Sequence, residues 1–178
     1  MTCICAVAGS GTVVLGGDSA LSSEDGDRTL RSPKVFQRHG MLFGASGEMR
    51  IAQLIQHVYD VPTPDEAADI ERFVVRELCG GLRTFLREQA EELLPSPDDD
   101  EMWELMVATR GRIFQVCSHL SVAESATGYD AIGSAMPQAL GSLASTEGRP
   151  PRERVETALR AAERHHGGVA GPFTILEL

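Results

Sequence analysis

The first twenty residues, MTCICAVAGSGTVVLGGDSA (residues 1–20), carry the pattern that decides the fold. Two apolar runs rich in β-branched residues flank the turn-forming stretch Gly9–Gly11, which predicts a β-hairpin. If the turn is centred on Ser10, residue i lies opposite residue 20 − i, and Thr2 faces Asp18 with Cβ atoms about 5 Å apart. A polar pair at the mouth of an apolar hairpin is typical of a functional site, although strand ends are often polar without any function.

Lys34 is the only lysine among the 16 basic residues of the chain. A lysine ammonium can lose its charge when buried and an arginine guanidinium cannot, so a chain that otherwise uses arginine has a chemical reason to keep one lysine. A genome whose codons favour arginine explains the same pattern without any function. The sequence leaves both explanations open.

The rest of the chain predicts short strands and amphipathic helices in blocks. We expect strands at 35–36, 41–43, 105–109, 113–118 and 173–176, and helices from about 48, over 63–93, at 137–145 and at 151–166. The predicted order is β-hairpins, two helices, a hairpin, two helices and a strand. This order indicates an α+β fold rather than parallel βαβ units. With no repeat or linker, residues 1–178 are expected to form a single domain.

The composition excludes several classes of partner. A net charge of −10 and a pI near 4.9 argue against nucleic acid and anionic membranes, since both repel an acidic surface. The chain has neither a signal peptide nor an apolar run near the ~20 residues of a membrane span, so we expect a cytoplasmic protein. Cys3 and Cys5 have no second Cys/His pair nearby, which favours buried thiols over zinc ligands. We expect no metal and no cofactor.

Thr2, Asp18 and Lys34 stand at equal intervals of sixteen residues, with Gly16-Gly17 directly before the aspartate. This spacing resembles the proteasome β-subunit and HslV group of N-terminal nucleophile (Ntn) hydrolases, and most of all their small bacterial and phage relatives. Three further stretches are similar to that family: the strand and glycine loop at 42–47, the Gly-Ser turn at 131–134 and the small residues at 166–168. The resemblance covers nearly the whole chain and implies a four-layer αββα sandwich.

The resemblance also implies a mechanism. Removal of Met1 would expose Thr2 as an N-terminal nucleophile whose α-amine, with a reference pKa of about 7.7–8.0, takes the proton of its own hydroxyl. Lys34 would lower the pKa of that amine, and Asp18 would hold Lys34 charged and oriented. We expect activation by methionine excision alone.

Further positions follow from the same resemblance. The Gly44 N–H is the expected oxyanion donor, and Ser134 is expected to support the amine by hydrogen bonding. Glu163 stands where the family has a supporting aspartate. Three apolar residues are candidates for a specificity pocket, although core packing explains them equally well: Leu21, Phe36 and Leu42.

The expected activity is that of a threonine-type peptidase that cleaves peptides or unfolded proteins by acyl transfer. Family members assemble into rings, so the resemblance implies a homo-oligomer, with an ATP-dependent unfoldase as a candidate partner. Two alternatives stay open. The chain could be a catalytically inactive ring or scaffold subunit, or an Ntn amidase acting on a small amide, because a fold does not fix a substrate.

Overall fold

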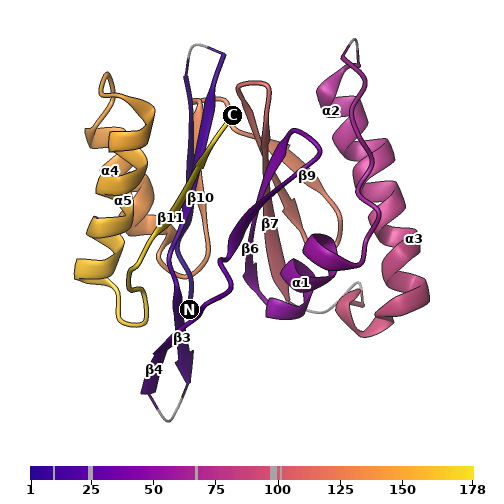
Figure 1. Ribbon diagram of the computed structural model, residues 1–178, viewed down its shortest axis with the longest axis horizontal. Coiled ribbons are helices and arrows are strands. Elements are labelled where there is room, and N and C mark those ends of the chain that lie inside the picture. The colour runs from indigo at the N-terminus through magenta and orange to yellow at the C-terminus, as the bar shows by residue number, and fades with distance from the viewer. Residues whose placement is uncertain (10, 24–25, 67, 97–99, 101) are drawn as a thin grey trace.

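Two antiparallel sheets form the centre of the computed structural model, which describes residues 1–9, 11–23, 26–66, 68–96, 100 and 102–178. The four-stranded sheet has the order β10 (Tyr129–Ile132), β1 (Ile4–Ala8), β2 (Val13–Gly17), β11 (Thr174–Glu177). The five-stranded sheet has the order β5 (Val35–Arg38), β6 (Met41–Gly47), β7 (Trp103–Thr109), β8 (Arg112–Cys117), β9 (Val122–Glu124). A ribbon of β3 (Ala20–Ser23) and β4 (Gly26–Thr29) projects from this body (Figure 1).

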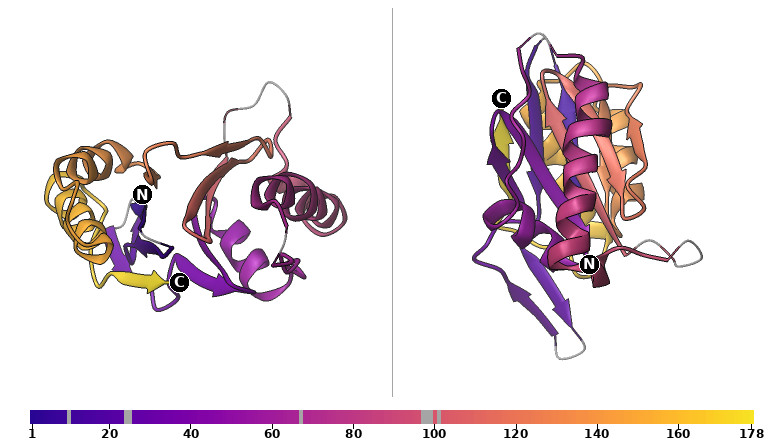
Figure 2. Two further views of the ribbon diagram at one scale, coloured as in Figure 1. Left: turned by 90° about the horizontal axis from the view of Figure 1, so that it is seen from above. Right: turned by 90° about the vertical axis from the view of Figure 1, so that its right-hand side faces the viewer.

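Helices cover the outer face of each sheet. They are α1 (Met49–His57), α2 (Ile70–Phe73), α3 (Cys79–Gln89), α4 (Met136–Ser145) and α5 (Pro151–His165). A π-helical turn, Val74–Leu78, joins α2 to α3, and a short 3₁₀ turn, Glu91–Leu93, follows α3. In Figures 1 and 2, α4 and α5 lie against the four-stranded sheet, while α1, α2 and α3 lie against the five-stranded sheet. The expected combination of helices and sheets is confirmed.

The alternating side chains of β1 explain why this strand is buried on both faces. Ile4 and Ala6 join the apolar cluster between the two sheets, together with residues such as Leu42 and Met106. Cys5 and Val7 point the other way and pack in the cluster under α4 and α5. Successive strand residues face opposite sides, so an apolar run without polar alternation is what a central strand requires. The nucleophile candidate therefore precedes one of the most buried strands of the molecule.

The register of the first hairpin differs from the expected one by a single residue. The structure pairs Ile4 with Gly17, so that residue i lies opposite residue 21 − i. Gly9 and Thr12 exchange both backbone hydrogen bonds, at 2.9 and 3.2 Å, which gives a two-residue turn rather than a turn centred on one residue. The predicted centre of that turn, Ser10, lies outside the described residues. The one-residue shift means that Thr2 and Asp18 are not directly opposed.

The second predicted helix begins later than residue 63. Its first turn starts at Ile70, where the Asp69 side chain accepts hydrogen bonds from the backbone N–H groups of residues 71 and 72. The guanidinium of Arg110 donates to backbone carbonyls of residues 64, 65, 66 and 68. These bonds hold the preceding segment in a non-helical conformation. Among the described residues, no helix has both the length and the apolar character of a membrane span.

Candidate active site

Thr2, Asp18 and Lys34 lie together where three strands meet. Thr2 comes just before β1, Asp18 directly follows β2, and Lys34 directly precedes β5. The first two strands are neighbours in the four-stranded sheet, whereas Lys34 reaches across from the five-stranded sheet. The predicted group is therefore assembled from both sheets. Thr2 and Asp18 are joined through the Lys34 side chain, and not by the direct pairing of strand residues that the sequence predicted.

Lys34 joins the other two residues through its ammonium group. Lys34 Nζ lies 3.0 and 2.9 Å from the two carboxylate oxygens of Asp18 and 3.2 Å from Thr2 Oγ1. The same nitrogen donates to the backbone carbonyl of Met1 at 2.9 Å. The Lys34 side chain is 10% exposed and that of Asp18 is 0% exposed. A shielded ammonium thus faces the hydroxyl of Thr2.

Asp18 is held in place by the backbone as well as by Lys34. Its Oδ1 accepts the N–H of Cys3 at 2.9 Å and its Oδ2 accepts the N–H of Ala20 at 3.0 Å. A buried carboxylate is costly unless it is paired and hydrogen-bonded, and both conditions are met here. The carboxylate therefore has one orientation, and it fixes that of the ammonium.

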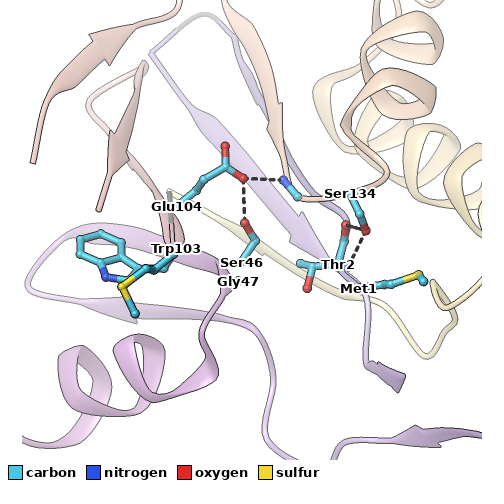
Figure 3. A pocket seen from close by; sticks show the side chains of 9 residues that line it. Met1, Thr2, Ser46, Gly47, Trp103, Glu104 and Ser134 are labelled. Atoms are coloured by element: carbon cyan, nitrogen blue, oxygen red, sulfur yellow. Dashed lines mark hydrogen bonds between the residues drawn. The ribbon is translucent and has the colours of Figure 1, made fainter. Parts of the chain in front are cut away.

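The turn between β10 and α4 contacts the Thr2 backbone. The Thr2 nitrogen donates to Ser134 Oγ at 3.2 Å (Figure 3). The N–H of Ala135 donates to the Thr2 carbonyl at 3.2 Å. Gly133 has φ +90°, and a Cβ at this position would lie 2.5 Å from the Thr2 carbonyl oxygen. Only glycine permits both the positive φ and this close approach. The Gly133-Ser134 pair thus brings the Ser134 hydroxyl within hydrogen-bond distance of the Thr2 nitrogen.

A second polar group, which the sequence did not reveal, lies beside Thr2. Glu104, on β7, accepts hydrogen bonds from Ser46 Oγ at 2.9 Å and from the N–H of Gly133 at 3.0 Å (Figure 3). Its other oxygen accepts from Gln115 Nε2 at 2.8 Å. A glutamate near the start of an apolar strand carries no motif, so only the folded chain brings it to the site.

Two cavities open beside Thr2. The first, of about 380 Å³, is lined by residues that include Ser46, Gly47, Glu104 and Ser134. The second, of about 200 Å³, lies on the Lys34 side and is lined by the following residues, among others: Ala20, Leu21, Leu30, Ala45, Gly47, Met49, Ala52 and Gln53. Both cavities include Thr2, Gly47 and Met1, a residue that is 62% exposed. A substrate bound across Thr2 therefore has space on either side of it.

Gly44 does not lie where the sequence placed it. It sits in the middle of β6, aligned with Val35 of β5 on one side and with Met106 of β7 on the other. A Cβ at this position would lie 2.7 Å from Ile4 Cγ2, in the core between the sheets. Neither cavity at Thr2 includes Gly44, and both include Gly47. The sequence contains two glycines in the 42–47 stretch, and the structure brings the later one to the site.

Glu163 binds a loop, whereas the Thr2 nitrogen binds Ser134. Its side chain is exposed and accepts the N–H of Gly171 at 2.8 Å, in the loop that follows α5. The same loop offers the carbonyl of Ala170 to the N–H of Ser19 at 3.0 Å. Glu163 thus stabilises a loop that packs next to Asp18, and it lines neither cavity.

The three candidate pocket residues divide between cavity and core. Leu21 lines the smaller cavity. Phe36 is 5% exposed and stacks on Phe43 with ring centroids 5.5 Å apart, in the cluster facing the helices. Leu42 is fully buried between the sheets. Core packing, the alternative that the sequence left open, is the structural role of the last two.

The thiol of Cys3 is buried next to this group and stays protonated. Burial, and then the nearby charge of Asp18, raise its pKa to about 12, while Lys34 opposes the shift. All four cysteines are free, Cys3, Cys5, Cys79 and Cys117. Within the described part of the chain, no group of three or more His, Cys, Asp or Glu side chains could hold a metal ion.

Comparisons with known proteins identify the fold. No family model matches the chain, and no curated protein is detectably similar in sequence. Among solved structures, BPH from Thiobacillus denitrificans is similar with a TM-score of 0.81 and 17% identity over 99% of this chain and 97% of that one. A second BPH structure is a complex with epoxomicin.

Two further structures have the same overall arrangement. HslV from Trypanosoma brucei has a TM-score of 0.69 and 19% identity over 99% of both chains. Anbu (ancestral beta-subunit) from Yersinia bercovieri has a TM-score of 0.70 and 15% identity over 99% of this chain and 81% of that one. At these identities the likeness shows the fold, and it confirms the resemblance to HslV and proteasome-like proteins at that level.

Proposed function

Because this chain has the fold of HslV and Anbu, we propose that it is a threonine-type peptidase that cleaves peptide bonds by acyl transfer after removal of Met1. One observation carries the proposal: Lys34 Nζ lies within hydrogen-bond distance of both Thr2 Oγ1 and the Asp18 carboxylate. An ammonium at 3.2 Å favours the ionised form of a hydroxyl. The buried Asp18 carboxylate pairs with that ammonium and orients it toward Thr2.

The proposed reaction uses the two functional groups of Thr2. The free α-amine takes the proton of Oγ1 as the oxygen bonds to the substrate carbonyl carbon. As the tetrahedral intermediate collapses, the C–N bond breaks and the departing amine takes this proton. A water molecule, deprotonated by the same α-amine, then attacks the ester and restores the hydroxyl. Lys34 stays protonated throughout and stabilises negative charge on Oγ1.

Ser134 has the position to orient the amine. The Thr2 nitrogen already donates to Ser134 Oγ at 3.2 Å while it is part of the Met1–Thr2 peptide. After excision the same atom becomes the α-amine, and the hydroxyl of Ser134 can accept one of its protons. This bond would point the amine lone pair toward Oγ1 rather than toward solvent.

We assign the oxyanion donor to the Gly47 N–H in place of Gly44. The N–H of Ala45 donates to the carbonyl of Lys34 at 3.2 Å, on the β5 side of β6. Because N–H groups alternate sides along a strand, the Gly47 N–H points the same way, beyond the last paired residue of β5. Gly47 lines both cavities with Thr2, so its N–H can meet charge that develops on a bound carbonyl.

Several finer properties belong to the same proposal. We assign the layers of helices and sheets to the four-layer αββα sandwich of Ntn hydrolases, folded as a single domain of residues 1–178. We also propose a cytoplasmic homo-oligomeric ring that takes peptides or unfolded protein segments as substrates, with an ATP-dependent unfoldase as a candidate partner. The 200 Å³ cavity beside Lys34 has room for a small substrate side chain.

Labelling with epoxomicin, followed by mapping of the modified residue, tests the proposal. Intact mass is measured first, because only a chain without Met1 has a Thr2 amine. We expect an adduct on Thr2 that is absent from Thr2→Ala and from Lys34→Ala. A chain that retains Met1 in full, or one that lacks Met1 and yet forms no adduct, contradicts the proposal and favours an inactive scaffold subunit.

A further inference from the structure

We propose that Glu104 is a positioning residue that fixes the oxyanion donor relative to the Thr2 amine. The inference rests on the proposed function. Glu104 Oε2 accepts a hydrogen bond from Ser46 Oγ at 2.9 Å and one from the N–H of Gly133 at 3.0 Å. Figure 3 shows the carboxylate of Glu104 facing the hydroxyl of Ser46, with a dashed line between them.

Both donors are sequence neighbours of residues in the proposed site. Ser46 directly precedes Gly47, the proposed oxyanion donor, on β6 of the five-stranded sheet. Gly133 directly precedes Ser134, which contacts the Thr2 nitrogen, in the turn after β10 of the four-stranded sheet. A single carboxylate oxygen therefore connects the two halves of the site.

This connection supplies a restraint that apolar packing does not. The two sheets meet through an apolar cluster, and hydrophobic burial is non-directional, so it sets their separation only loosely. Catalytic groups must stay within about 0.5 Å of the productive geometry. Two hydrogen bonds to one charged oxygen are directional and stronger than neutral ones, so they fix the separation of Ser46 and Gly133.

The surroundings of Glu104 keep the carboxylate in this one arrangement. Gln115 Nε2 binds the opposite oxygen at 2.8 Å, and Ser46 is 5% exposed. Gly133 is fixed by its positive φ and by its close approach to the Thr2 carbonyl. Among the described residues Glu104 forms no salt bridge, so its charge strengthens the bonds to these three neutral donors.

The test compares three variants of the full chain. Glu104→Ala removes the link and is expected to lower kcat and the rate of Thr2 labelling by about 10- to 100-fold, with KM changed little. Glu104→Gln keeps an oxygen that can accept both bonds, while its NH₂ can donate to a turned Gln115 amide. Charged hydrogen bonds are about twice as strong as neutral ones, so we expect this variant to stay within about fivefold of wild type.

The matched control is Glu124→Ala. Glu124 is a glutamate of the same sheet that pairs with Arg112 and lines neither cavity at Thr2. We expect its labelling rate and kcat to equal those of wild type. Melting temperatures of all variants separate a loss of folding from a loss of positioning.

Ser46→Ala provides a second route if Glu104→Ala does not fold. It removes one of the two bonds, so we expect a smaller fall in kcat than in Glu104→Ala. The double variant should have the same kcat as Glu104→Ala alone, because both substitutions break the same link. Additive losses, an unchanged kcat in folded Glu104→Ala, or a failure of Glu104→Gln to restore the rate contradicts the inference. Wild-type protein that lacks Met1 and is not labelled at Thr2 contradicts the proposed function instead.

Discussion

At the scale of one residue, the buried carboxylate of Asp18 allows a direct test of the proposed site. Asp18→Asn keeps the shape but leaves the Lys34 ammonium without a counter-charge and turns an amide NH₂ toward a backbone N–H. We expect the free energy of unfolding to fall by about 3–5 kcal/mol, as for a broken buried ion pair. We also expect labelling of Thr2 to slow by at least about 100-fold.

Asp69→Asn is the control for this substitution. Asp69 accepts backbone N–H groups at the start of α2, and asparagine is an equally good N-cap. Urea denaturation and labelling kinetics should therefore match wild type. If Asp18→Asn labels at the wild-type rate, the carboxylate does not act on Lys34 in the proposed way.

Cys3 makes the stability of the protein depend on alkaline pH. Its pKa is about 12 in the folded protein, first because of burial and then because of Asp18, against 9.0 for an ordinary thiol. Above pH 9 the unfolded chain releases a proton that the folded chain retains, so the free energy of unfolding falls as pH rises. We expect Cys3 to contribute a loss of about 1 kcal/mol between pH 8 and pH 10.

Urea denaturation at both pH values checks this expectation. The fall in stability should be smaller in Cys3→Ala than in wild type by about that amount. Cys79 and Tyr59, whose pKa values are also raised to about 12, titrate in both proteins and cancel in the comparison. Equal losses in wild type and variant would show that Cys3 ionises in the folded protein.

The sequence alone pointed to those candidate site residues that lie close together in one hairpin or that are of an unusual residue type. Lys34 stood out as the only lysine, and Thr2 and Asp18 as polar ends of an apolar hairpin. Glu104 could not be found in this way, because its role depends on partners on β6 and in the turn after β10. A sequence pattern does not indicate which residues, distant along the chain, will donate hydrogen bonds to a single carboxylate.

At the scale of the element, strand β6 contains two glycines, Gly44 and Gly47, in different structural environments. Gly47 has φ +81°, and a Cβ there would clash with the carbonyl oxygen of Met102 and lie 2.8 Å from Trp103 Cα. We expect Gly47→Ala to displace the backbone and reduce Thr2 labelling by about 100-fold or more. Gly44→Ala should instead destabilise the core by about 1–3 kcal/mol and leave the labelling rate of the folded protein unchanged.

Labelling kinetics on both variants, corrected for the folded fraction, separate the two glycines. The reverse result, with Gly44→Ala inactive and Gly47→Ala active, would return the oxyanion role to Gly44. The sequence predicted the strand and its glycine loop and assigned the oxyanion role to Gly44, whereas the cavities at Thr2 favour Gly47. The choice depends on where β5 ends beside β6, which is a tertiary feature.

The errors in element boundaries have similar causes. The hairpin register differs by one residue because the turn closes between Gly9 and Thr12, and residue type alone did not fix how many residues it contains. The late start of α2 depends on Arg110, more than 40 residues away along the chain, which binds the carbonyls of the preceding segment. Long-range hydrogen bonds here override a local start signal.

At the scale of the whole molecule, the order of strands and helices was predictable because each element carries its own periodicity. Apolar runs became central strands, and amphipathic stretches became the outer helices. The oligomeric state cannot be predicted in the same way, since it depends on surfaces that a single chain leaves exposed. It therefore stays a prediction.

We expect native mass spectrometry to show a closed homo-oligomer whose mass is an integer multiple of the mass of one chain, which is 19.2 kDa before Met1 is removed. The sample should lack Met1, so that the mass also reports maturation. A protein that stays monomeric at micromolar concentration contradicts the ring. If such a monomer is nevertheless labelled at Thr2, a free-standing amidase becomes the better description.

The Met1–Thr2 peptide bond is held on both sides in the folded protein. Its carbonyl accepts from Lys34 Nζ at 2.9 Å, its nitrogen donates to Ser134 Oγ at 3.2 Å, and Thr2 is only 8% exposed. An aminopeptidase needs the same bond extended and free. We therefore expect Met1 to be removed from the nascent chain, before the first hairpin folds. Refolded protein that still carries Met1 should resist methionine aminopeptidase, while a peptide of residues 1–10 is cut.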